Sequence, residues 1–371
     1  MNLVDKLHAE IASAGGWLAF DRFMATALYA PGQGYYAGGR RKFGTMPSEG
    51  SDFVTAPEMS PLFGRALARQ LAQAMDASGC RDLMEFGAGS GALAAQLIAE
   101  LDALGAGLAR YRIVELSAEL RGRQRERLAH WRDRVEWLDE LPDEIEAVVV
   151  GNEVLDAMPV QLIAFDGQAW RERGVVGAGA GFAFEDRDSR LRPPLQDPGH
   201  GGFVPGTVTE IHPQAEAFVR TLARRLKCGA AFFIDYGFPE AEYYHPQRLG
   251  GTLMCHYRHH AHPDPFLYPG LQDITAHVNF SGIAQAAVEA GLQVSGYASQ
   301  ARFLMNAGIT DLMMSLDPSD ARAFLPQANA VQKLLSEAEM GELFKVIALT
   351  RGIDDAMPLD GFARGDRSFA L

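Results

Sequence analysis

Residues 82–93 constrain this chain most, and they read Asp-Leu-Met-Glu-Phe-Gly-Ala-Gly-Ser-Gly-Ala-Leu. Their apolar start and three alternating glycines predict a buried strand, a tight turn and the first residues of a helix. A second strand-like run, residues 111–116, contains the acid Glu115. In open α/β folds, this order of elements holds a nucleotide-like cofactor at the edge of a parallel sheet.

The rest of the chain repeats the alternation of short apolar runs and helical patterns, which is typical of a parallel sheet with helices on both faces. The apolar runs predict seven strands, at residues 82–86, 110–114, 134–138, 147–151, 230–235, 293–299 and 344–350. The periodic segments predict helices near residues 91–104, 117–129, 213–227, 281–290 and 328–338. The predicted fold class is therefore α/β, with a Rossmann-like, seven-stranded and mostly parallel sheet.

The pattern also predicts two parts of the chain. Residues 1–78 form a helical lobe and lid, with helical periodicity over 2–29. Residues 79–371 form the core, which carries two insertions. The first, at about 160–205, has the short strands and glycine-rich joints of an antiparallel sheet, and the second, at about 239–272, is rich in His, Tyr and Pro.

Composition limits the partners and the compartment. The 371 residues carry a formal charge of −13, which argues against nucleic acid and favours a basic partner, because phosphate binding needs clustered cations. Three widely spaced cysteines predict free thiols in a reducing compartment. No apolar run approaches the roughly 20 residues that span a bilayer, and the N-terminus lacks a signal-peptide pattern. We therefore expect a cytoplasmic protein without membrane insertion.

The glycine-rich turn fits two cofactors. Gly87, Gly89 and Ala92 match the relaxed dinucleotide pattern. Glu115 lies 26 residues beyond Gly89, close to the separation of a ribose-binding acid. Glu85 favours S-adenosylmethionine instead, because an acid suits its ammonium and sulfonium groups and would repel a pyrophosphate. A turn that only packs a helix on a strand is the third interpretation.

A second acidic group follows the apolar run 148–150. Residues 151–159 read Gly-Asn-Glu-Val-Leu-Asp-Ala-Met-Pro, which places Glu153 and Asp156 three residues apart. On a helical turn this spacing brings both carboxylates to one face at the carboxyl edge of the sheet, where open α/β folds bind ligands. The arrangement predicts a clamp for a cationic substrate, and the alternative is a helix N-terminal cap.

Histidines supply further candidates. Four of them lie close together, namely His256, His259, His260 and His262. Their irregular spacing without nearby cysteine indicates a solvated or substrate-facing loop rather than a metal site, and we expect no metal. His277 is a candidate for the substrate pocket, with a structural histidine as an equal alternative.

Several longer motifs together carry a resemblance to a known family, at residues 29–36, 52–64, 85–91, 151–159, 235–237 and 273–280. They resemble the MidA-like family of S-adenosylmethionine-dependent methyltransferases, and the likeness extends to residue 367. That family includes an assembly factor of mitochondrial complex I that methylates an arginine of a complex I subunit. Asn279 stands where an acid is expected in this family. The resemblance implies a class I methyltransferase core and transfer to an arginine of a protein.

The resemblance also implies a set of cofactor-binding residues, which are Glu85, Gly87, Gly89, Gly91, Glu115, Leu116, Leu138 and Asp139. The first acid and the glycines would hold the aminocarboxypropyl end of S-adenosylmethionine. The second acid would accept hydrogen bonds from both ribose hydroxyls. The two leucines would flank the adenine, with the last acid near its amino group.

For the methyl acceptor, the implied residues are Asn152, Glu153, Asp156 and His277. Glu153 would bind the substrate guanidinium together with Asp156 or with the loop acids Asp52 and Glu58. Arginine is a poor nucleophile because its charge is delocalised and its pKa exceeds about 12, so two carboxylates would localise the charge and aim one nitrogen at the methyl group. Two other functions remain open, a non-catalytic S-adenosylmethionine-binding assembly chaperone and an NAD-dependent dehydrogenase. In a eukaryote the compartment would be the mitochondrial matrix.

Overall fold

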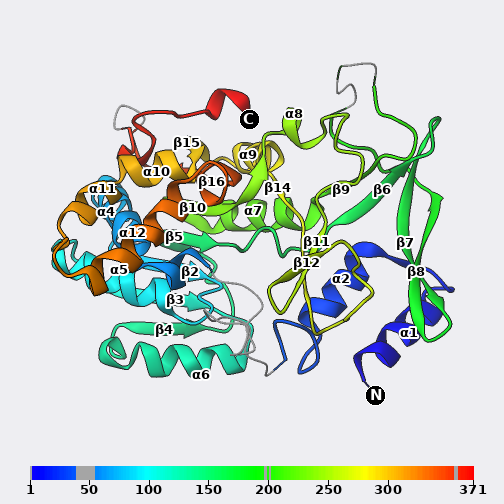
Figure 1. Ribbon diagram of the computed structural model, residues 1–371, viewed down its shortest axis with the longest axis horizontal. Helices are drawn as coiled ribbons and strands as arrows, with labels where there is room; N and C mark the ends of the chain where they lie inside the picture. The colour runs from blue at the N-terminus through cyan, green and yellow to red at the C-terminus, as the bar shows by residue number, and fades with distance from the viewer. Residues whose placement is uncertain (1, 39–54, 196–198, 200–201, 355–357) are drawn as a thin grey trace.

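The computed structural model describes residues 2–38, 55–195, 199, 202–354 and 358–371. A large sheet flanked by helices lies beside a smaller, β-rich part that contains the N-terminal helices (Figure 1). Across the described ranges, no helix combines the length and the apolar character needed to cross a membrane.

The large sheet has the seven strands that the sequence predicts. Their spatial order is β15 (Gln293–Ser299), β16 (Phe344–Arg351), β10 (Leu226–Phe238), β5 (Ile145–Asn152), β2 (Asp82–Phe86), β3 (Arg110–Val114) and β4 (Val135–Leu138). The five strands from β10 to β4 run parallel, whereas β16 is antiparallel to both β10 and β15. The prediction of a mostly parallel sheet is therefore confirmed. A short strand, β14 (Val278–Asn279), pairs in parallel with the end of β10.

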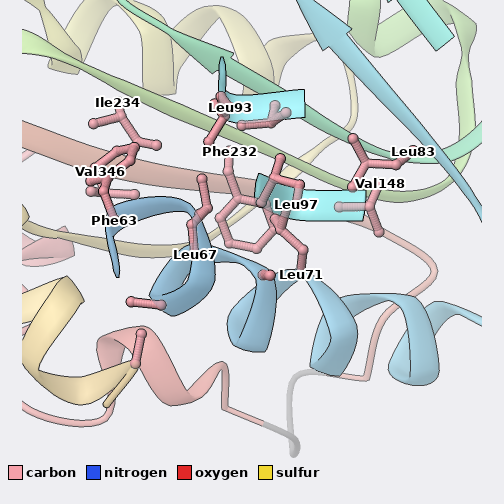
Figure 2. Close-up of a cluster of buried hydrophobic side chains, with 14 of the residues drawn as sticks. Phe63, Leu67, Leu71, Leu83, Leu93, Leu97, Val148, Phe232, Ile234 and Val346 are labelled. Atoms are coloured by element: carbon pink, nitrogen blue, oxygen red, sulfur yellow. The ribbon is translucent and has the colours of Figure 1, made fainter. Parts of the chain in front are cut away.

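Helices cover both faces of this sheet, so its central strands are buried and apolar. One face packs against α4 (Pro61–Ser78), α5 (Ala92–Ala103), α10 (Gln300–Asn306), α11 (Ile309–Met314) and α12 (Ala321–Leu335). In Figure 2, Leu67 of α4 and Leu97 of α5 lie beside Phe232 of β10 in this core. The other face packs against α7 (Pro213–Arg225) and α9 (Phe280–Glu289). The helix α6 (Ala118–Arg127) lies beside β4 (Figure 1).

The helix α12 begins seven residues before its predicted start at 328. The side chain of Asp320 caps the helix by accepting a hydrogen bond from the Ala323 amide. The buried residues of α12 lie only in its second half, from Ala330 onward. Apolar periodicity therefore marks only that half, and the prediction missed the exposed first turns.

The N-terminal segment is helical, as predicted, but a strand interrupts it. The helices are α1 (Leu3–Ser13) and α2 (Phe20–Tyr29), and β1 (Leu18–Ala19) lies between them. Gly15 and Gly16 have φ values of +78° and +88°, which end the first helix. The prediction of helix over 2–29 is wrong at Leu18–Ala19, because these two residues pair with β7 (Trp170–Ala178) of a distant sheet.

That distant sheet is formed mainly by the first insertion, whose antiparallel strands are confirmed. Its strands are β1, β6 (Gln161–Phe165), β7 (Trp170–Ala178), β8 (Gly181–Asp188) and β9 (Val208–Ile211). The helices α1 and α2 pack against it through a shared apolar cluster. By contrast, α4 packs on the large sheet. The division of the chain at residue 78 stays a prediction.

The second insertion contains more regular structure than its composition predicts. It forms α8 (Glu240–Tyr243) and the strands β11 (Met254–Tyr257) and β12 (His260–His262), and β11 also pairs with β13 (Asp273–Thr275). The histidine-rich segment is therefore a hairpin and not an irregular loop. Its turn places Arg258 and His259 at positive φ. Turns of this kind usually carry Gly, Asn or Asp, so the sequence did not indicate a hairpin here. In the part of the chain that the structure describes, no group of three His, Cys, Asp or Glu side chains could hold a metal ion.

The remaining helices are short. They are α3 (Ala56–Met59) and α13 (Met340–Leu343), with 3-10 turns at Ala129–Trp131, Asp360–Phe362 and Ser368–Ala370.

Candidate active site

A cavity of about 590 Å³ lies at the carboxyl ends of β2, β3 and β5. Residues of α2, α3, β11 and β13 complete its wall, so the N-terminal helices and the second insertion close a site that begins on the large sheet. The volume lies within the range of cavities that bind small molecules and cofactors.

The glycine-rich turn forms one part of this wall. Gly87 and Gly89 line the cavity with φ values of +64° and +53°, which L side chains rarely adopt. The amide of Gly87 donates a hydrogen bond of 3.0 Å to the Val114 carbonyl, which ties the turn to β3. The helix α5 starts directly after the turn, at Ala92, so its free amide groups face the same region and suit a carboxylate.

Two buried acids lie on either side of this turn and line the cavity. Glu85 is the fourth residue of β2, and its carboxylate accepts a hydrogen bond of 2.7 Å from the Tyr111 hydroxyl. Burial raises the pKa of Glu85 to about 8. Glu115 follows β3 directly, and its carboxylate accepts hydrogen bonds from the Ser117 amide at 2.9 Å and the Gln124 side chain at 3.1 Å.

One of the three residues predicted to contact an adenine lines the cavity, and the other two do not. Leu116 lines the cavity and 77% of its surface is exposed, so its apolar side chain is available to contact a ligand. Leu138 and Asp139 do not line it, and the Asp139 carboxylate pairs with the Arg121 guanidinium at 2.5 Å. Leu141 lies in the wall instead, in a segment whose sequence gave no cofactor signal. Gly91, at φ +80°, caps α5 outside the lining.

A second set of polar residues lines the cavity where β5 ends. Asn152, Glu153 and Asp156 all contribute to the wall. Residues 153–159 form a turn rather than a helix, so Asp156 is not a helix cap. Glu153 adopts φ +54°, a strained conformation for a residue with a side chain, and such strain is common at functional sites.

Asp235, at the end of β10, holds this turn in place. One of its carboxylate oxygens accepts hydrogen bonds from the amides of Val154, Leu155 and Asp156, at 3.0, 2.8 and 3.3 Å. The Glu153 amide donates to the Ile234 carbonyl at 2.9 Å. In the sequence, only the 235–237 motif points to Asp235, and it predicts no role for this residue.

The acidic residues near this turn strongly affect one another. Burial raises the pKa of Glu153 to about 8, and the charge of Asp235 adds to this shift. Burial also raises the pKa of Asp235 to about 7 and that of Asp156 well above its usual range. Within the described residues, one buried oxygen each of Asp156 and Asn152 has no hydrogen-bond partner. A bound cation with several N–H donors would satisfy both features.

Two tyrosines of the N-terminal region face the same acids. The rings of Tyr29 and Tyr36 stack with their centroids 5.5 Å apart, and both line the cavity. The Tyr29 hydroxyl donates to the Ala157 carbonyl at 2.8 Å. The Tyr36 hydroxyl lies 3.0 Å from both carboxylate oxygens of Asp273, which also lines the cavity.

Comparison with known proteins decides the family. The model of a family of S-adenosyl-L-methionine-dependent methyltransferases matches residues 66–298. The chain belongs to this family. This methyltransferase is 28% identical to mouse protein arginine methyltransferase NDUFAF7, mitochondrial, over 90% of the chain and 81% of that protein. The human protein of the same name is 26% identical over 90% of the chain and 80% of its own length.

Solved structures agree with the fold of this methyltransferase. A Burkholderia thailandensis protein crystallised with S-adenosyl-homocysteine is 61% identical, with a TM-score of 0.96 over 100% of this chain and 96% of that one. A native crystal structure from the same organism is 60% identical, with a TM-score of 0.91. The large sheet is accordingly the class I methyltransferase sheet, and the cofactor is S-adenosylmethionine.

The residues of this methyltransferase fit that cofactor. The positive-φ glycine turn leaves room for close approach, and the two buried acids, Glu85 and Glu115, lie on either side of it. The bound cofactor supplies an electrophilic methyl group on a sulfonium, and the acids of the wall suit its positive charge. Among the described residues, no Lys or Arg lines the cavity. Because the chain belongs to a family of S-adenosylmethionine-dependent methyltransferases, the glycine-rich turn is not interpreted as a dinucleotide site.

Two further predicted residues of the methyltransferase, His277 and Glu58, do not line the cavity. The His277 ring stacks on Phe238 with centroids 5.3 Å apart and does not line the cavity, and burial lowers its pKa to about 4. The Glu58 carboxylate accepts hydrogen bonds from the Ser90 hydroxyl and the Arg127 guanidinium beside the glycine turn. Asp52 lies outside the described residues. His256, predicted only as part of a loop, does line the cavity.

Proposed function

We propose that this methyltransferase transfers a methyl group to an arginine side chain of a protein. The observation that carries the proposal is the acidic region of the cofactor cavity, where Glu153, Asp156 and Asp273 line one wall. A guanidinium offers five N–H donors and a permanent positive charge, which match these acceptors. The unpartnered oxygens of Asp156 and Asn152 are suited to two of those donors.

Binding would change the protonation of these acids. Glu153 and Asp235 have raised pKa values of about 8 and about 7, so the free protein holds protons in this region near neutral pH. A guanidinium nearby favours the charged carboxylates and would expel a proton. The carboxylates then hold the guanidinium in one orientation, which localises its charge and aims one nitrogen at the methyl group. The nitrogen would form the new bond to the methyl carbon while the bond of that carbon to sulfur breaks, which leaves S-adenosylhomocysteine as the neutral product. The nitrogen would lose its proton to a carboxylate, for which Glu153 is the candidate.

We assign roles to the remaining residues on the same basis. Glu85, Gly87 and Gly89 would hold the aminocarboxypropyl end of the cofactor, and Glu115 would bind its ribose. Gly91, which does not line the cavity, would act as the cap of α5. Leu116 would contact the adenine, with Leu141 in the wall beside it. The His277 ring stacks on the Phe238 ring, so we assign His277 a structural role and no contact with the substrate.

For the protein substrate, we propose a subunit of respiratory complex I, or a similar protein that is methylated during assembly. The support is the family resemblance and the similarity to the mouse and human protein arginine methyltransferases. In a bacterial cell the reaction would take place in the cytoplasm, and in a eukaryote in the mitochondrial matrix.

The test is a methyl-transfer assay on an extract from cells that lack this protein. Purified protein and S-adenosylmethionine with a labelled methyl group are added, and mass spectrometry locates the label. We expect one or a few labelled protein bands that contain methylarginine. Label on another residue type would contradict the arginine proposal, and the absence of any labelled protein would favour an assembly chaperone.

Two variants sharpen this assay. Glu153→Gln should reduce transfer by at least about 100-fold, because a positioned acid or base contributes about 10²- to 10⁴-fold. Its Kd for S-adenosylhomocysteine should stay within about threefold. Glu210→Gln is the matched control, because Glu210 is fully buried and does not line the cavity. Equal losses of transfer and cofactor affinity in Glu153→Gln would contradict its assignment to the acceptor.

A further inference from the structure

The helix α6 packs directly against the cofactor-binding turn. A Cβ atom added to Gly91 would lie 3.5 Å from Gln124 of this helix. Gln124 is completely buried, although glutamine is usually exposed. A buried amide is stable only when its donors and acceptor are satisfied, so its partners indicate why it is there.

All the partners of Gln124 can be named. Its Nε2 donates to the Gly89 carbonyl at 2.9 Å and to the Glu115 carboxylate at 3.1 Å. Its Oε1 accepts a hydrogen bond of 2.8 Å from Nε1 of Trp137, on β4. One side chain therefore joins the glycine turn to the acid that follows β3.

The chemistry of these partners fixes the orientation of the amide. The Trp137 indole is only a donor, whereas the Gly89 carbonyl and the Glu115 carboxylate oxygen serve as acceptors. A flipped amide would place its oxygen against two acceptors and its NH₂ against a donor. Trp137 thus sets the direction in which Gln124 donates, and Gln124 in turn sets the relative position of Gly89 and Glu115.

We propose that Gln124 is a positioning residue for S-adenosylmethionine binding, which holds the glycine turn and the ribose-binding acid at a fixed separation. Gln124 does not line the cavity and acts through Gly89 and Glu115, which do. A binding site keeps its affinity only when such supporting contacts hold its groups in place. The inference rests on the cofactor and does not depend on the arginine acceptor.

The proposal is tested with Gln124→Met, which keeps the length of the side chain and removes its polar atoms. Gln300→Met is the matched control, because Gln300 is also fully buried, donates to the Leu334 carbonyl and does not line the cavity. S-adenosylhomocysteine is titrated into each full-length protein by calorimetry, and thermal unfolding is measured without ligand. We expect the Kd to rise at least about tenfold in Gln124→Met, as for the loss of one or two buried hydrogen bonds, and less than about twofold in the control.

A second variant decides the question if Gln124→Met fails to fold. Trp137→Phe keeps an aromatic ring and removes only the donor that orients the amide. We expect a rise in Kd of about threefold, in the same direction and with a smaller change in Tm. An unchanged Kd in a folded Gln124→Met protein would overturn the proposal. If Gln124→Met does not fold, an unchanged Kd in Trp137→Phe would overturn it. A control variant that weakens binding as much as Gln124→Met would overturn it too.

Discussion

At the scale of single residues, the site is built at the expense of stability. Glu153 combines a positive φ with a half-buried side chain whose carboxyl pKa is raised, and the buried Asp235 and Asp156 place further acids beside it. Each feature costs free energy in the folded protein, since buried like charges repel and left-handed backbone is strained. Such a cost is typical of functional sites, where binding or catalysis needs groups that the fold alone would not favour.

The first prediction concerns the pH dependence of stability. The pKa of Glu153 rises from 4.5 to about 8 on folding, so between these values the folded protein binds a proton that the unfolded chain has lost. The free energy of unfolding therefore falls as pH rises through this range. Glu153→Gln should be more stable than the native protein by at least about 1 kcal/mol near pH 9. Near pH 4.5 the two should be almost equal.

Urea unfolding over this pH range measures the difference. Asp143→Asn serves as the control, because the Asp143 side chain is fully exposed. A dependence on pH in this control as large as that of Glu153→Gln would show that the effect does not come from Glu153. A gain in Glu153→Gln that does not grow with pH would show that this carboxyl is not held protonated by the fold.

The second prediction separates backbone strain from cofactor binding at the glycine turn. Gly87 and Gly105 have almost the same φ, +64° and +66°, so alanine at either should cost about 1–2 kcal/mol of stability. A methyl group at Gly105 meets nothing within 4 Å, whereas at Gly87 it lies 3.3 Å from the Val154 side chain in the cavity wall. Calorimetry should therefore show about a tenfold rise in the Kd for S-adenosylhomocysteine in Gly87→Ala alone. Similar Kd values in both variants would contradict the placement of the turn against the cofactor.

At the scale of elements, two parts of the chain far apart in sequence meet at one cavity. The strand ends of the large sheet supply the acids and glycines, and α2 supplies Tyr29 next to Ala157. The packing of α2 is aromatic, because its Phe23 contacts Phe182 and Phe266 from the two insertions. The position of Tyr29 therefore depends on how well α2 is packed.

The third prediction follows from this packing. Phe23→Ala should lower the free energy of unfolding by about 3–5 kcal/mol, as for other buried phenylalanines. It should also reduce methyl transfer more than affinity for S-adenosylhomocysteine, because Tyr29 of α2 bonds to Ala157 in the turn that we propose binds the acceptor. Phe303→Ala is the matched control, since Phe303 is equally buried but packs in a core of the large sheet and not in the apolar cluster that holds α2. Parallel losses of transfer and binding in Phe23→Ala would contradict the division of the cavity.

At the scale of the whole molecule, the negative net charge and the acidic residues of the cavity wall both suit a positively charged partner. The chain carries 47 acidic against 34 basic residues, and several acids are buried at the cavity rather than spread over the surface. An acidic molecule attracts a basic partner at long range, and the acids at the site would then select its cationic side chain.

The fourth prediction tests the cofactor on the intact protein by thermal unfolding. A ligand that binds only the folded state at about 100 times its Kd adds about 2.7 kcal/mol of stability. S-adenosylmethionine and S-adenosylhomocysteine should each raise the Tm by a few degrees. NAD at the same concentration should leave the Tm unchanged, because the cavity offers Glu85 where a pyrophosphate would need cations. A shift with NAD alone would contradict the cofactor assignment.

The sequence by itself determined the large sheet and the cofactor turn. Buried parallel strands leave continuous apolar runs, and a positive-φ turn requires glycine, so both leave direct marks in the order of residues. The acids Glu153 and Asp156 were equally visible, because they follow such a run directly. Seven strands and the Gly87 turn were therefore predicted in place.

Only the tertiary structure decided which distant residues complete the site. Gln124 bonds to Gly89, 35 positions away, and Asp235 bonds to Val154, 81 positions away, and no local pattern records such contacts. For the same reason Leu141 and not Leu138 lines the cavity, and His277 packs on Phe238 instead of reaching the acids. Short-range sequence patterns report burial and backbone conformation, whereas the partners of a buried polar group depend on how strands and helices meet in space.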